Sequence, residues 1–154
     1  MKKILALSVV FIVLIISKAK SQPVYDWAVD YGGNSQEYGN VVGIDGLNNI
    51  YVYSFLNSSG VNPTVIGSYT ITSTGPAVIK LDENRNVIWV KTLSGGSSPK
   101  GKPMSIDLQG NVYITGYFSG TIYVDSFTLT SVNSNSDAYI IRLDSNGNVL
   151  WAKS

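Results

Sequence analysis

The stretch LDENRNVIWVKT at residues 81–92 returns almost unchanged as LDSNGNVLWAKS at residues 143–154. A shift of 62 residues superimposes the two copies and also places Trp27 on Trp89 and Trp89 on Trp151. The same shift aligns a second set of residues: Ile44 with Ile106, Asp45 with Asp107, Asn49 with Asn111 and Tyr51 with Tyr113. Self-similarity at a fixed period is the signature of stacked repeat architectures. The chain therefore holds one structural unit twice, preceded by the end of a third copy at YDWAVDYGG.

Between its matching ends the repeat slips in register. VIGSYTITS at residues 65–73 matches YVDSFTLTS at residues 123–131, which is a shift of 58. The four residues missing before this segment are recovered after it, and surface loops tolerate such insertions and deletions. The segment is predicted to be a strand or a short hairpin between loops.

The second copy has the alternating pattern and the turn punctuation of β-strands. We expect a hairpin from PMSIDL (103–108) and VYITGYF (112–118), and a second hairpin from AYIIRLD (138–144) and VLWAK (149–153). No stretch of the chain after residue 21 keeps the 3.6-residue apolar period of a helix. Each unit is thus predicted to be one small antiparallel sheet of four principal strands. A sheet of that size cannot cover both of its faces alone, and Trp89 and Trp151 are suited to fill the space between stacked sheets.

These motifs, in this order, resemble the bacterial β-propeller repeat called SBBP. The matching residues are Gly95-Gly96, Ile106-Asp107, Gly110-Asn111-Val112-Tyr113-Ile114-Thr115-Gly116, Asp137 to Asp144 and Gly147-Asn148-Val149-Leu150-Trp151-Ala152. The resemblance implies propeller blades in exported or cell-surface proteins, with no common catalytic activity. The first copy departs from the pattern at three positions: Asn48 replaces Gly110, Ser54 replaces Gly116 and Arg85 replaces Gly147. If Gly147 has a positive φ, Arg85 strains or relaxes its turn.

The predicted fold is therefore all-β, with tandem four-stranded antiparallel blades of an incomplete propeller. We expect a signal peptide at residues 1–21, the tail of a preceding repeat at 22–34, one blade at 35–92 and a second blade at 93–154. Closed propellers need about four to eight blades. Three alternatives stay open: a piece of a longer array, copies that self-associate through open blade faces, or a stable short arc.

The N-terminus indicates export. Lys2 and Lys3 precede an apolar run at residues 4–16, and small residues at Ala19 and Ser21 suit cleavage before Gln22. The run is shorter than the roughly 20 residues of a membrane-spanning helix. We expect a secreted or cell-surface protein without a membrane span after cleavage. Removing residues 1–21 leaves seven basic and ten acidic residues, a net charge of −3.

Several function classes are disfavoured by composition. The closest approach to the basic face of a nucleic-acid-binding protein is Lys100 and Lys102, predicted in one loop. The chain has no histidine, so the usual general base and the usual metal ligand are missing. It also has no cysteine, so packing and sheet pairing must hold the fold without disulfides. A Gly-x-Ser-x-Gly string is also absent after residue 21.

Two five-residue segments of the sequence resemble calcium-binding loops. Residues 82–86 and 144–148 alternate oxygen side chains as calcium loops do, but the twelfth position counted from Asp82 is Leu93, where an EF-hand loop requires Glu. Asp and Asn also favour tight turns, which is the preferred interpretation. Asp45 and Asp107 are copies of one position and are explained by the repeat itself. Three carboxylates outside the repeat register have no evident partner: Glu37, Asp125 and Asp137. We therefore predict no catalytic, cofactor or metal site.

Two functions from different classes follow. The first is a non-catalytic, exported repeat module that binds a protein or a glycan or acts as a scaffold. The alternative is part of a secreted lyase or hydrolase whose active site lies on other blades. Because a fold does not determine a function, the preference for a binding module rests partly on the family resemblance.

Overall fold

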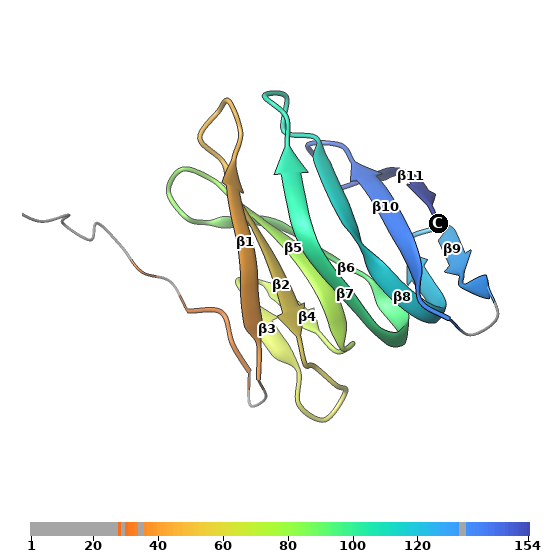
Figure 1. Ribbon diagram of the computed structural model, residues 1–154. Coiled ribbons are helices and arrows are strands. Elements are labelled where there is room, and N and C mark those ends of the chain that lie inside the picture. The colour runs from red at the N-terminus through yellow and green to blue at the C-terminus, as the bar shows by residue number, and fades with distance from the viewer. Residues whose placement is uncertain (1–27, 29, 34–35, 133–134) are drawn as a thin grey trace, which may run out of the picture.

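The chain folds into two antiparallel sheets that pack face to face (Figure 1). This computed structural model describes residues 28, 30–33, 36–132 and 135–154. The strands in this part of the chain are β1 (Tyr38–Ile44), β2 (Ile50–Leu56), β3 (Thr64–Ile66), β4 (Tyr69–Ile71), β5 (Gly75–Leu81), β6 (Val87–Thr92), β7 (Ser94–Ile106), β8 (Val112–Val124), β9 (Phe127–Thr130), β10 (Asp137–Leu143) and β11 (Val149–Lys153). The all-β prediction is confirmed.

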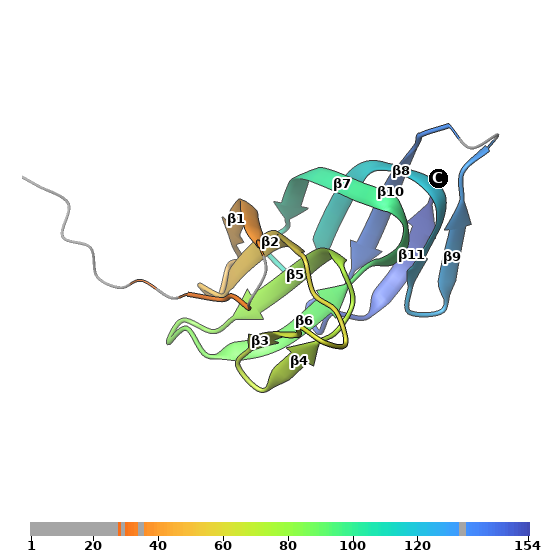
Figure 2. The same cartoon turned by 90° about the horizontal axis from the view of Figure 1, so that it is seen from below.

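The first sheet has the strand order β1-β2-β5-β6, and the second has the order β7-β8-β10-β11 with β9 paired to β8. All of these pairs are antiparallel. The short β3–β4 ribbon of the first half takes the place that β9 and the end of β8 take in the second. Both sheets are therefore the predicted four-stranded, blade-like units. The described residues do not close a ring (Figure 2).

Three local expectations need correction. The first predicted hairpin exists, but β7 begins at Ser94, nine residues before the predicted strand, because its pairing with β8 continues through three register shifts. Lys100 and Lys102 consequently lie in a strand and not in a loop. Gly95 and Gly96 lie inside β7, where their positive φ values of 81° and 67° accompany the first bulge. The variable segment is a hairpin, but its first strand is the continuation of β8.

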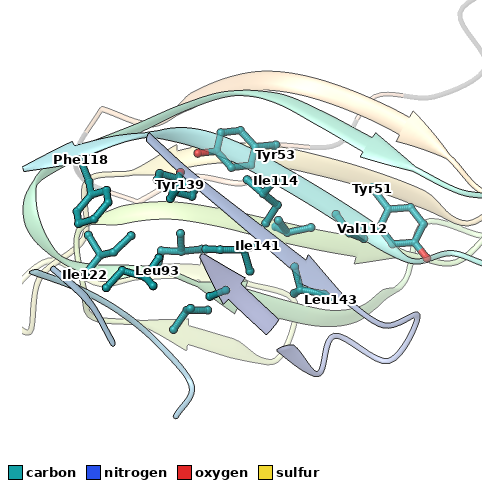
Figure 3. Packing of buried hydrophobic residues seen from close by; sticks show 14 of the residues in the cluster. Tyr51, Tyr53, Leu93, Val112, Ile114, Phe118, Ile122, Tyr139, Ile141 and Leu143 are labelled. Atoms are coloured by element: carbon teal, nitrogen blue, oxygen red, sulfur yellow. The ribbon is translucent and has the colours of Figure 1, made fainter. Parts of the chain in front are cut away.

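The larger core fills the space between the sheets (Figure 3). The first sheet contributes Tyr51, Tyr53 and Val78, and the second contributes alternate residues of β8 and β10, such as Ile114 and Ile141. A smaller cluster lies on the other face of the first sheet: Leu56, Ile66, Ala77, Ile79 and Leu81, with Tyr31 packed against it. Because both of its faces are covered, β5 is buried along its whole length.

The second sheet has one open face. Across β8, β10 and β11, the residues Tyr113, Arg142 and Trp151 are direct neighbours in register. They occupy the same face as Tyr117 and Ile140, which are 44% and 38% exposed. Their counterparts in the first sheet, Tyr51, Lys80 and Trp89, face the second sheet and are buried. The repeat therefore presents the same row of side chains twice, once covered and once open.

One departure from the repeat is compensated inside its own sheet. Gly116 pairs with Tyr139, and a Cβ on Gly116 would lie 2.7 Å from the tyrosine ring. At the matching pair in the first sheet, Ser54 lies opposite Ala77. A larger residue on one strand is thus matched by a smaller residue on its neighbour, as constant packing volume requires. Ser54 in place of Gly116 is therefore no irregularity of the first sheet.

This pairing predicts a strong coupling. Gly116→Ser alone is expected to reduce the free energy of unfolding by about 1–3 kcal/mol through overpacking. In the Tyr139→Ala background, the same change should cost at least about 1 kcal/mol less, because the obstructing ring is gone. Urea unfolding of the four chains of this double-mutant cycle measures the coupling. Additive losses would show that the ring and the glycine are independent.

Candidate functional site

Four turns of one design lie at the same edge of the two sheets. They join β1 to β2, β5 to β6, β7 to β8 and β10 to β11, and each begins with an aspartate and ends with an asparagine. The aspartates are Asp45, Asp82, Asp107 and Asp144. In every turn the backbone N–H of the aspartate donates to the carbonyl of the asparagine four residues later. These turns give the edge its acidic character.

Each aspartate side chain accepts hydrogen bonds from residues of its own turn. Asp107 shows the pattern: Oδ1 accepts from the backbone N–H of Gln109 and Asn111 at 3.0 and 2.9 Å, and Oδ2 accepts from Asn111 Nδ2 at 2.7 Å. Asp45 and Asp144 repeat all three bonds, and Asp82 repeats the two bonds to Asn86. These bonds agree with the tight turns that the sequence predicts at Asp82 and Asp144, and they show the same turn at Asp45 and Asp107.

The fourth residue of every turn adopts the left-handed conformation. Gly110 and Gly147 have φ values of 80° and 82°, while Asn48 and Arg85 have values of 62° and 72°. Asparagine tolerates this region well, and arginine occupies it at a cost of about 1 kcal/mol. Arg85 therefore keeps the geometry of its turn instead of relaxing it. Both glycines belong to the second sheet, and both non-glycine residues belong to the first.

Hydrogen bonding keeps all four carboxylates ionised. The amides of Asn86 and Asn111 lower the pKa of Asp82 and Asp107, respectively. Burial alone would raise the pKa of Asp45 and Asp144, but hydrogen bonds from Asn49 and Asn148 and from nearby backbone N–H groups outweigh it, so these pKa values are also lowered.

The first sheet docks onto the turns of the second through main-chain carbonyls. Trp89 Nε1 donates to the carbonyl of Ser145 at 3.1 Å, and Lys80 Nζ donates to the same oxygen at 2.9 Å. The Tyr51 hydroxyl lies 3.2 Å from the carbonyl oxygen of Gly110 and 3.0 Å from Asp45 Oδ2, so its one proton is shared between these two acceptors. The predicted place of Trp89 between neighbouring sheets is confirmed.

Absent side chains make this approach possible. A Cβ on Gly147 would lie 2.9 Å from Trp89 Cδ2, and a Cβ on Gly110 would lie 2.7 Å from the Tyr51 hydroxyl. A third contact lies farther out, where Lys91 Nζ binds both carboxylate oxygens of Asp125 at 2.8 and 2.9 Å. Asp125 is the tip of the β8–β9 hairpin. The second sheet thus offers two bare turns and one acid to the first.

A buried polar cluster lies behind this contact. The Asp45 carboxylate accepts from the Tyr51 hydroxyl at 3.0 Å and lies 4.0 Å from Lys80 Nζ, which in turn sits 5.1 Å from the centre of the Tyr51 ring. Lys80 is only 6% exposed, so its charge requires these partners. Burial, followed by the bond to Asp45 and its charge, raises the pKa of Tyr51. With every member engaged in binding another, the cluster is built for docking the two sheets.

The other carboxylates singled out from the sequence have separate partners. Glu37 accepts from the Thr64 hydroxyl at 3.0 Å, Asp137 accepts from the backbone N–H of Val132 at 2.8 Å, and Asp125 binds Lys91. Within the described ranges, no three acidic side chains come close enough to hold a metal ion. A shallow hollow over the bulge of β1 is lined by Gly39, Asn40, Val41, Val42 and Val52, none of which carries a charge.

The edge with the four turns also carries apolar tips. Leu47 and Leu108 are 78% and 77% exposed, and they belong to the neighbouring β1–β2 and β7–β8 turns. These turns touch, because a Cβ on Gly46 would lie 2.8 Å from the Leu108 carbonyl oxygen. We call the four turns with these two leucines the turn edge. Sequence reasoning missed it, since each leucine is unremarkable alone and only the packing of the sheets brings the turns together.

The chain is similar to a repeat protein. An uncharacterized WD repeat-containing protein of Acanthamoeba polyphaga mimivirus is 31% identical over 99 residues, which are 58% of this chain and 7% of that protein. WD repeats form four-stranded propeller blades, so the similarity and the two sheets agree on a repeat of the propeller type. No family model matches the chain, and no solved structure matches it.

The predicted signal peptide and Trp27 lie outside the described residues. Within that described part, no helix is long and apolar enough to span a membrane.

Gly147 tests the docking of the two sheets. Gly147→Ala should lower the free energy of unfolding by about 1–3 kcal/mol more than Gly120→Ala, because the added methyl group collides with Trp89. Gly120 is a matched control, because its φ of 80° is close to the 82° of Gly147 and an added Cβ is therefore strained to the same degree. The atom nearest to a Cβ on Gly120 is 3.7 Å away, so this Cβ meets no obstacle. Denaturant unfolding of both variants measures the difference. Equal losses would mean that Trp89 does not rest on this turn.

The ionised aspartates predict a loss of stability in acid. Their pKa values are lower in the folded chain than in the unfolded chain, where aspartate titrates near about 3.9. The stabilisation is therefore complete above about pH 5 and disappears as the pH falls below about 4. Urea unfolding at a series of pH values from about 5 down to about 2 should show this loss, and Asp107→Asn should flatten the profile in part. An unchanged profile in that variant would separate the turn carboxylates from the acid response.

Proposed function

We propose that the protein is an exported, non-catalytic repeat module that binds another protein at the turn edge. The observation that carries this proposal is the pair of exposed leucines, Leu47 and Leu108, on adjoining turns. Apolar side chains gathered on an exposed surface are characteristic of protein contacts, and polar groups around them supply specificity. A partner suited to this edge presents an apolar patch next to basic groups, because the ionised Asp107 directly precedes Leu108 and the ionised Asp82 and Asp144 lie in turns of the same edge.

Other observations support the same proposal. The similarity to part of a WD repeat-containing protein favours a repeat that serves as a binding scaffold. The order of motifs from Gly95 to Trp151 favours a repeat of the SBBP type, and the basic and apolar N-terminus favours export. The cluster of Asp45, Tyr51 and Lys80, which has the composition of a catalytic site, is engaged in joining the sheets.

Binding without turnover is the expected behaviour. The protein is expressed in a bacterial host, and we expect to recover it from the periplasm as a chain that begins at Gln22. On a protein array this chain should bind partner proteins. The double variant Leu47→Ser/Leu108→Ser should bind them at least about tenfold more weakly, a loss of about 1.4 kcal/mol in binding free energy. The matched control is Val61→Ser, since Val61 is 88% exposed and lies in the β2–β3 loop at the opposite end of the sheet.

Mass spectrometry of the captured ligands separates binding from catalysis. Unchanged ligand masses are expected. Cleavage products that accumulate with time would replace the proposal with a lyase or hydrolase. Capture of glycans in place of proteins, or equal losses in the leucine and Val61 variants, would also contradict binding of a protein at the turn edge.

A further inference from the structure

The open face of the second sheet repeats the docking row of the first sheet, position by position. Tyr51, Lys80 and Trp89 correspond to Tyr113, Arg142 and Trp151, and Lys91 corresponds to Lys153. The geometry is also repeated, because the Arg142 guanidinium lies 5.4 Å from the centre of the Tyr113 ring, as Lys80 lies 5.1 Å from that of Tyr51. The open face therefore keeps every donor that the covered face uses.

One donor on this face is left unsatisfied. Arg142 Nε is buried and has no hydrogen-bond partner among the described residues. At the equivalent place, Lys80 donates to the carbonyl of Ser145 on the neighbouring sheet. The Arg142 guanidinium carries five N–H donors, and a carbonyl in the same relative position would accept from its exposed end.

The acceptor side of the repeat is not kept in the same way. The second sheet receives its neighbour with Gly110, Gly147 and Asp125. At the matching positions the first sheet has Asn48, Arg85 and Gly67. Gly110 faces Tyr51 and Gly147 faces Trp89 in the contact between the two sheets. If the first sheet were placed on the open face in the same way, Asn48 would face Tyr113 and Arg85 would face Trp151. Each would then insert a side chain where no Cβ fits. Gly67 would leave Lys153 without an acid.

We propose that the face formed by Tyr113, Arg142, Trp151 and Lys153 binds a blade-like sheet that has glycine at the fourth position of both Asp-x-x-x-Asn turns and an acid at the tip of its hairpin. The second sheet of this chain has that chemistry, and the first sheet lacks it. The face therefore binds a sheet with these residues and does not bind the first sheet of a second copy of the chain. Because the inference concerns the stacking of repeats, it stands or falls independently of ligand binding at the turn edge.

The inner strand sets one further requirement. Gly43 and Gly46 let the first sheet approach Ile106 and Leu108 closely. The matching residues of the second sheet are Ser105 and Leu108. An occupant identical to the second sheet must therefore stand slightly farther away at this end.

A chain lengthened by one unit tests the proposal. Ser154 is equivalent to Thr92, so a second copy of residues 93–154 can follow Ser154 in register. The matched control carries Gly110→Asn, Asp125→Gly and Gly147→Arg in the added unit only. With the faithful unit, hydrogen exchange of the Trp151 indole N–H in the original unit should slow by at least about tenfold, because the group becomes buried and bonded. With the altered unit the rate should stay as in the original chain.

Two further measurements keep the test decisive. The faithful unit is also added to a chain with Ser105→Gly/Leu108→Gly in the original unit, which provides the missing space at the inner strand. Absence of protection in both backgrounds, or equal protection by the faithful and altered units, would overturn the proposal. The unextended chain should remain monomeric in light scattering. Self-association that Trp151→Ala abolishes would equally overturn it, since a second copy would then occupy the face.

Discussion

The seating of Trp89 on a turn without side chains is the contact on which the arrangement of the two sheets depends. The indole ring lies over Gly147, and its N–H, together with the Lys80 ammonium, shares the Ser145 carbonyl. Because the acceptor is main chain, the two sheets can approach until only backbone separates them. That approach buries Tyr51 and Tyr53 completely against the second sheet and closes the larger core.

The repeat unit explains why this contact is needed. A four-stranded sheet buries too little apolar surface by itself to offset the entropy of ordering its chain. When sheets stack, each sheet buries apolar side chains on the face that it turns to its neighbour. The first sheet shows the result, since β5 is buried throughout while the second sheet has an open face. The polar cluster of Asp45, Tyr51 and Lys80 adds directional bonds to this burial, so that the stacking has a fixed register as well as a favourable energy.

Much of this could be predicted from the sequence, for a physical reason. Strand pairs and their turns are local, so alternation and the Asp-x-x-x-Asn spacing placed the hairpins close to where they are. The extension of β7 was missed because bulges and two glycines interrupt its alternation. The docking contacts were missed except for Trp89, since their partners are 34–65 residues apart and most of the acceptors are carbonyls, which every residue has. At Arg85 the sequence predicts only strain within its own turn, whereas the packing of the two sheets shows that this position of the turn faces a neighbouring sheet.

A carbonyl acceptor changes which residues control the stacking. Lys80 and Arg142 differ between the two copies, as do Ser145 and Glu83 on the accepting turns, yet either cation can donate to either main-chain oxygen. These hydrogen bonds to main-chain carbonyls therefore discriminate little between one sheet and another. Discrimination comes from the atoms that must be absent, the Cβ atoms at Gly110 and Gly147, and from the charge at Asp125. The same hydrogen-bond donors can thus occur in every copy of the repeat while only some sheets are able to stack on them, because one side chain in a turn is enough to block the contact.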